Sequence, residues 1–182
     1  MYRFHLFGRI SNFKIKKSLI ILYLAGFTLA ISTAFPAYIN SSFIENFVNT
    51  KLVGLFFVAA NIMTFLAMLF FPTIIKKFSN LLSSKLMMLL NIVSLMVLMM
   101  SPAPIWLFVF FIGMWISSNL LWINMDLFVE SFTENSNTGK TRAIYFTFMN
   151  LGWIFSPMFA SKLVVGNDHY NLVYLASSIL IL

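Results

Sequence analysis

Charged residues are scarce in this chain, and acidic ones are the scarcest. Only 9% of the 182 residues are charged and only five are acidic, whereas soluble domains carry about 25% charged residues. Hydrophobic residues make up 60% of the chain, and the mean hydropathy is +0.91. A soluble domain of this length cannot bury so much apolar side chain. The composition therefore indicates an integral membrane protein whose main partner is the lipid bilayer.

Several kinds of functional site are excluded by what is missing. Cysteine is absent, which rules out a disulfide framework and a thiolate metal site. His5 and His169 lie too far apart in the sequence to form a metal site. We find no glycine-rich phosphate loop, no nucleophile paired with a base, and no acidic residue at mid-membrane depth. The sequence therefore predicts no enzyme, no cofactor and no metal site.

The net charge of +7 raises the question of a nucleic-acid partner. Such binding requires basic residues gathered on one face of a soluble fold. Here the basic residues lie between long apolar runs, which is the pattern that encodes membrane topology. We therefore predict no nucleic-acid partner.

Apolar runs of about 20 residues are long enough to cross the bilayer as helices. Stretches such as LMMLLNIVSLMVLMM lack the alternating polarity of a membrane barrel, so we predict an all-α, polytopic helix bundle. The first run follows a basic tail, as in a signal peptide, but its length and the spans after it favour a retained helix. The last run is too short to cross, and we expect the sequence to be truncated within a sixth helix. The prediction is a tail at 1–17, five complete helices and a partial sixth, at 18–39, 52–75, 85–101, 104–128, 143–165 and 171–182.

Basic residues are unevenly divided between the two sets of predicted loops. Ten of the twelve fall in the 1–17 tail, the 76–85 loop or the 129–142 loop. Only Lys51 and Lys162 fall on the other side. Because loops rich in Lys and Arg stay in the cytoplasm, the sequence predicts a cytoplasmic amino terminus.

The stretch NMDLFVESFTENSNTGKTR, residues 124–142, holds three of the five acidic residues. Two of these acids end the fourth predicted helix and an arginine begins the fifth, so each charge opposes the dipole of its own helix. The polar loop between these helices is short, and we expect the two helices to be direct neighbours. The charges are explained by plain interfacial solvation or by a gate that holds one conformation closed. The predicted cytoplasmic charge cluster comprises Asp126, Glu130, Arg142, Lys76 and Lys77.

Small residues recur at a spacing of four on the first and fifth predicted helices. Such residues let helix backbones approach closely in lipid. They are explained by simple packing, or by helices that also slide or rock against each other. The two sets are Gly26, Ala30 and Ala34, and Gly152, Ser156 and Ala160.

Polar side chains inside the predicted spans need partners or water. Interhelical hydrogen bonding explains them, and the alternative is that some line a polar passage. Pro36 and Pro157 are weak signs of such a passage, because each removes a helical hydrogen bond. Tryptophans either stack on a ligand or anchor the protein at the interface. The candidate cavity-lining residues are Thr28, Ser32, Asn61, Asn119, Trp122 and Asn150.

Two segments resemble the first half of a major facilitator superfamily transporter. The pattern N-x-D-x-F-x-E-S, T-G-x-x-R and N-L-x-W-x-x-x-P in residues 124–157 resembles the helix 4–5 segment of a bacterial branch of that superfamily. TIIKKFSNLLSSKL, residues 73–86, resembles a degenerate loop 2–3 signature, with basic residues, Ser79 and Asn80 where an Asp and glycines are usual. The matching residues of the first segment are Asn124, Asp126, Phe128, Glu130, Ser131, Thr138, Gly139, Arg142, Asn150, Leu151, Trp153 and Pro157.

The resemblance implies alternating-access transport of a small solute across a bacterial-type plasma membrane. A second six-helix half would complete a site between the halves near mid-membrane. The alternative is a non-transporting membrane scaffold, or a half-transporter subunit that needs a partner chain. The substrate, the coupling ion and the direction of transport leave no mark in the sequence.

Overall fold

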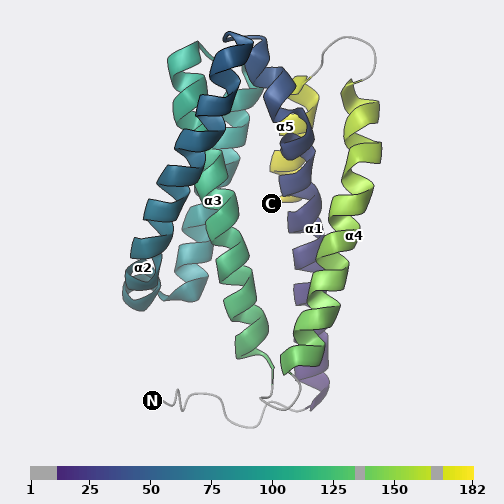
Figure 1. Ribbon diagram of the computed structural model, residues 1–182. Helices are drawn as coiled ribbons and strands as arrows, with labels where there is room; N and C mark the ends of the chain where they lie inside the picture. Colours follow the sequence, from purple (N-terminus) through teal and green to yellow (C-terminus); the bar gives the residue numbers. More distant parts are fainter. Residues whose placement is uncertain (1–11, 134–137, 165–169) are drawn as a thin grey trace.

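Helices account for every regular element that the structure describes. The computed structural model describes residues 12–133, 138–164 and 170–182, and side chains from Ser18 onward. Four long helices are followed by the shorter α5 (Tyr170–Leu180) (Figure 1). The long helices are α1 (Asn12–Glu45), α2 (Thr50–Met99), α3 (Pro104–Ser131) and α4 (Thr138–Val164). The predicted all-α class is confirmed for these residues.

Local sequence signals explain where two of the helices begin. The side chain of Asn49 accepts a hydrogen bond of 3.0 Å from the backbone N–H of Lys51, which caps the first turn of α2. Pro104 opens α3, where its missing N–H costs nothing and its fixed φ suits a helix. Pro36, Pro72 and Pro157, in contrast, lie inside α1, α2 and α4 without ending them.

Ser79 divides α2 into two antiparallel parts. It is the one residue inside α2 with non-helical backbone angles, φ 68° and ψ 160°. The chain reverses there, so that residues 50–78 and 80–99 run in opposite directions (Figure 1). Helices had been expected at 52–75 and 85–101 with a polar loop between them. Most of that loop, including Lys76 and Lys77, is helical instead.

The expected count of five complete helices and a partial sixth is matched only in part, because the second and third expected helices form the two antiparallel parts of one element, α2. Among the described residues, four helices are long and apolar enough to cross a membrane. The helix ends also differ, most clearly in α1, which begins six residues before the expected 18–39 span and ends six residues after it. A helix of 34 residues is about 50 Å long, whereas the hydrocarbon core is about 30 Å thick. Hydropathy therefore indicates which part of a helix lies in the hydrocarbon core. It does not indicate where the helix begins and ends.

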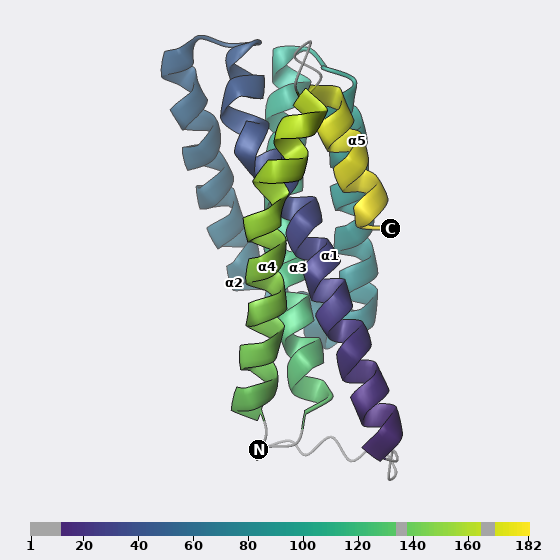
Figure 2. The same cartoon turned by 90° about the vertical axis from the view of Figure 1, so that its right-hand side faces the viewer.

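The helices pack in two groups. The most extensive contacts are those of α2 with α3 and of α1 with α4, and α5 packs against α1 and α2. Contacts between α3 and α4 are few, and the two helices diverge from the end at which the chain links them (Figure 1). The expectation that they are direct neighbours is therefore wrong along most of their length. α4 lies chiefly against α1 instead (Figure 2).

Much of the bundle's outer surface is apolar. Phe65 and Phe70 of α2 are 62% and 66% exposed, and Ile154 of α4 is 64% exposed. The described charged side chains lie toward the helix ends or close to the reversal of α2 at Ser79. Long helices with apolar outer faces and charged ends indicate an integral membrane protein.

Candidate functional site

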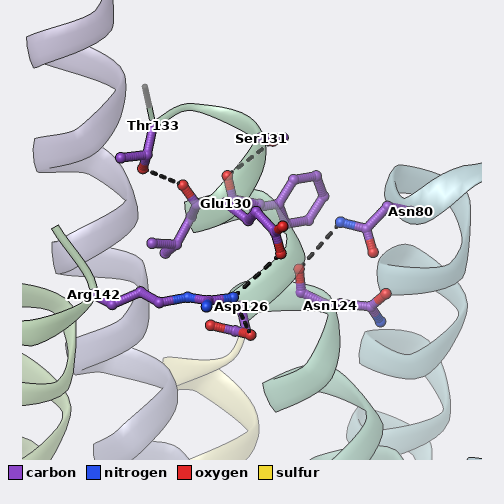
Figure 3. A network of polar contacts seen from close by, with 9 residues as sticks. Asn80, Asn124, Asp126, Glu130, Ser131, Thr133 and Arg142 are labelled. Atoms are coloured by element: carbon purple, nitrogen blue, oxygen red, sulfur yellow. Dashed lines mark hydrogen bonds and ion pairs between the residues drawn. The ribbon is translucent and has the colours of Figure 1, made fainter. Parts of the chain in front are cut away.

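One arginine joins α4 to two acids of α3 at the end of the bundle where α1 begins. The Nη2 atom of Arg142 lies 3.0 Å from Asp126 Oδ2 and 3.2 Å from Glu130 Oε2 (Figure 3). The side chains of Arg142, Asp126 and Glu130 are 35%, 40% and 60% exposed. The cluster is therefore partly solvated, and its attraction is weaker than that of a buried pair.

This contact uses a single guanidinium nitrogen. Nε of Arg142 and Oδ1 of Asp126 are buried and have no hydrogen-bond partner in the described residues. A bidentate pair would use two parallel N–H···O bonds. The observed geometry is a looser ion pair made by one nitrogen. It brings the arginine at the start of α4 next to the acids at the end of α3, so that each charge, which opposes the dipole of its own helix, has a partner of opposite sign.

Lys76 and Lys77 are exposed, and neither forms an ion pair with an acid in the part of the chain that is described. The ammonium of Lys77 lies 5.4 Å from the centroid of the Phe78 ring. The turn of α2 reaches α3 through Asn80, whose Nδ2 donates to the backbone oxygen of Asn124 at 3.1 Å (Figure 3). A neutral amide thus links this turn to α3, whereas in the described residues the lysines do not join the acids of the predicted cluster. Glu134 and the turn residues 135–137 lie outside the described residues, as do Asp168 and His169.

A cavity of about 150 Å³ lies among α1, α2, α3 and α4. Three of the predicted lining residues, Ser32, Asn119 and Trp122, line it. Thr28 lines a second, mostly apolar cavity of about 370 Å³, together with Lys85 and Asn124. The first cavity is lined by Ser32, Thr33, Pro36, Ala37, Asn40, Asn91, Leu95, Met114, Trp115, Ser118, Asn119, Trp122 and Trp153.

Asn61 and Asn150 are exposed and line neither of these cavities. Asn61 donates through Nδ2 to the backbone oxygen of Phe57 at 2.8 Å. Its Oδ1 accepts from Nε1 of Trp115 at 3.3 Å. Asn61 thus forms a hydrogen bond between α2 and α3 with a tryptophan that lines the cavity, but Asn61 itself does not line it.

Sequence reasoning missed two amides of the first cavity as site residues. Asn40 and Asn91 are each 1% exposed. Nδ2 of Asn91 lies within hydrogen-bond distance of Ser117 Oγ at 2.9 Å and Ser118 Oγ at 2.8 Å, and so links α2 to α3. Oδ1 of Asn40 accepts from the hydroxyl of Tyr174 at 2.9 Å. Asn40 was missed because the first helix was expected to end at residue 39, which would place it outside the membrane.

The small residues of α1 and α4 meet at the contact between these helices. A Cβ on Gly152 would lie 2.7 Å from Cβ of Ala30, and a Cβ on Gly26 would clash with the ring of Tyr145. Every residue of the two predicted sets is buried: Gly26, Ala30, Ala34, Gly152, Ser156 and Ala160. α1 and α4 therefore approach each other as closely as their backbones allow.

Comparisons with family models, with curated proteins and with solved structures give no match to this chain. No group of His, Cys, Asp and Glu able to hold a metal ion occurs in residues 12–133, 138–164 and 170–182. The chemistry that the site offers is therefore hydrogen bonding and aromatic contact in the cavity and ion pairing at one end of the bundle.

Proposed function

We propose that this protein is an alternating-access transporter of small solutes, of the major facilitator type. The observation that carries the proposal is the cavity among α1, α2, α3 and α4, which holds hydrogen-bonding side chains inside a bundle of apolar helices. Polar groups inside a membrane-spanning bundle are costly, and they commonly mark the path of a solute. Transporter sites of this kind lie near the middle of the bilayer, between units that rock against each other.

The charge cluster of Asp126, Glu130 and Arg142 fits the role of a gate in such a mechanism. It joins α3, which packs mainly on α2, to α4, which packs mainly on α1, at a place where few other contacts connect the two helices. A partly exposed ion pair contributes up to about 1 kcal/mol. States that exchange during transport differ in free energy by about a few kcal/mol. Making or breaking this cluster would therefore change the relative populations of the two states without holding the protein in one of them.

The same proposal gives the protein an orientation. The end that carries the charge cluster also carries Lys76, Lys77, Lys85 and Lys140, whereas the opposite end carries Lys51 and Lys162. Regions rich in Lys and Arg stay in the cytoplasm. We place the charge cluster on the cytoplasmic side of a bacterial-type plasma membrane. By the family resemblance, a second six-helix half, on the same polypeptide or on a partner chain, completes the central site.

Uptake into proteoliposomes tests this function. Vesicles that contain the product of the full-length gene, together with its partner chain where the second half is separate, are incubated with a mixed library of small solutes, and the solutes retained inside are identified by mass spectrometry. We expect at least one solute to accumulate relative to protein-free vesicles. The double variant Asp126→Asn, Glu130→Gln removes the cluster, and we expect it to change the uptake rate about two- to fivefold, as an ion pair of this exposure allows.

Glu45→Gln serves as the matched control, because Glu45 lies at the opposite end of the bundle and, in the part of the chain that is described, only accepts a local hydrogen bond of 2.6 Å from Thr50 Oγ1. Its uptake rate should equal that of the wild type. If folded protein moves no solute, the transport proposal is wrong and a scaffold or a partner-dependent subunit takes its place. An unchanged rate in the double variant would remove the gate from the mechanism.

A further inference from the structure

The cavity among α1, α2, α3 and α4 carries hydrogen-bonding groups but no charge. None of its described lining residues is Asp, Glu, Lys, Arg or His. A charged solute in such a place would lose its hydration without gaining a counter-ion, which is energetically unfavourable. The lining therefore selects against ions and favours uncharged polar solutes.

Among the described residues, this lining holds one donor and one acceptor, on Asn40 and Asn119, that have no protein partner. Tyr174, which is fully buried, donates to Oδ1 of Asn40 and fixes that amide, while Nδ2 of Asn40 has no partner in the described residues. Asn119 has the opposite arrangement, because its Nδ2 donates to the backbone oxygen of Trp115 at 2.8 Å and leaves Oδ1 available. A hydroxyl group can donate and accept at once, so a solute with several hydroxyls can satisfy both kinds of group.

Aromatic faces supply the other half of the recognition. Trp115, Trp122 and Trp153 all line the cavity. An indole offers a broad apolar face together with a single N–H donor, which suits a solute with C–H groups on one side and hydroxyls on its edge. The cavity volume is about 150 Å³. A solute of that size is a small one.

We propose that this cavity binds a small uncharged polyhydroxylated solute of the sugar or polyol class. In this assignment Asn40 donates to a hydroxyl oxygen, Asn119 accepts from a hydroxyl, and a tryptophan covers the apolar face of the solute. The assignment rests on the proposed transport function, for which it names the substrate class.

Equilibrium binding to the full chain in nanodiscs, measured by titration calorimetry, tests the assignment. The uncharged probes are glucose, xylitol and inositol, and the charged probes are glucuronate and glucosamine, which keep the glucose skeleton. We expect at least one uncharged probe to bind with a Kd about tenfold or more below that of each charged probe. Asn40→Leu should raise this Kd about three- to tenfold, the usual effect of losing one hydrogen bond. Asn150→Leu, on an exposed amide outside the cavity, should leave the Kd unchanged.

Tryptophan variants provide a second, independent pair. Trp153→Leu removes an aromatic face from the cavity wall and should raise the Kd several-fold. Trp106→Leu changes a residue that is 57% exposed and lies outside the cavity, and it should have no effect. Should charged probes bind as tightly as uncharged ones, or should every uncharged probe fail to bind, the assignment is wrong.

The two proposals fail in different ways. If uncharged polyols bind but are not carried into proteoliposomes, transport is wrong and the binding site stands. If proteoliposomes accumulate only ionic solutes, transport stands and the polyol assignment is wrong.

Discussion

Gly152 lies at a close contact between α4 and α1. A Cβ at this position would lie 2.7 Å from Cβ of Ala30 and 3.0 Å from the backbone oxygen of Phe27. Neither atom can move aside by a side-chain rotation, so the hydrogen of Gly152 is what permits the contact. Lipid supplies no hydrophobic drive between helices, and their association depends on close packing of this kind.

Gly152→Ala should therefore destabilise the protein even though alanine favours helices. Overpacking of a fitted contact typically costs about 1–3 kcal/mol, and we expect a lower midpoint of thermal unfolding for the detergent-solubilised variant. Gly54→Ala is the matched control, because no atom lies within 4 Å of its new Cβ. The control should leave the midpoint unchanged or raise it slightly, as alanine replaces glycine in a helix. Equal midpoints for Gly152→Ala and the wild type would contradict the α1–α4 contact.

Cavity-lining residues were predicted correctly only where a residue both lies inside a predicted span and faces the cavity. Asn61 was a candidate because it lies inside a predicted span, yet it is exposed and bonds to Trp115 from outside the cavity. Asn40 lines the cavity but was excluded by a helix boundary set six residues too early. Hydropathy indicates roughly how deep a residue lies in the membrane. Whether its side chain faces the cavity depends on which helices become neighbours, and no single sequence segment shows which helices these are.

At the scale of elements, the reversal inside α2 depends on a single serine. Ser79 has φ 68° and ψ 160°, a region that only glycine adopts without strain and that costs other residues about 1–3 kcal/mol. Its side chain compensates in part, since Oγ accepts from the N–H of Leu82 at 3.4 Å. The sequence signalled a break between two apolar runs, but the basic and polar residues there predicted a loop. The amino-acid composition of this segment did not indicate that the chain reverses at a single residue.

Ser79→Gly should stabilise the protein by about 1 kcal/mol. Glycine removes the backbone strain, and glycine at a helix amino terminus loses only a few tenths of a kcal/mol relative to serine. Ser79→Ala is the matched variant, because it keeps the strain and loses the hydrogen bond to Leu82. Chemical or thermal unfolding in detergent should rank the midpoints as glycine above serine above alanine. A glycine variant less stable than the wild type would contradict the backbone conformation at this position.

At the scale of the whole molecule, the pairing of helices was less predictable than their existence. The short link between α3 and α4 led us to expect neighbours, but a short loop constrains only the helix ends that it joins. Beyond that end, the partner is set by side chains, and the small residues of α1 and α4 allow these two helices to approach each other closely. The charge cluster is consequently one of the few links between α3 and α4, which makes it suited to a gate.

The absence of cysteine allows the orientation of the bundle to be tested cleanly. Four exposed lysines, two at each end, can each be replaced singly: Lys77→Cys and Lys140→Cys at the end with the charge cluster, and Lys51→Cys and Lys162→Cys at the other end. The proposed orientation requires that a membrane-impermeant maleimide label the second pair on intact cells. The first pair should react only after the membrane is permeabilised, because the basic end stays in the cytoplasm. Labelling of Lys51→Cys and Lys77→Cys from the same side would mean that residues 52–76 do not cross the membrane, and both the cavity and the gate would lose their basis.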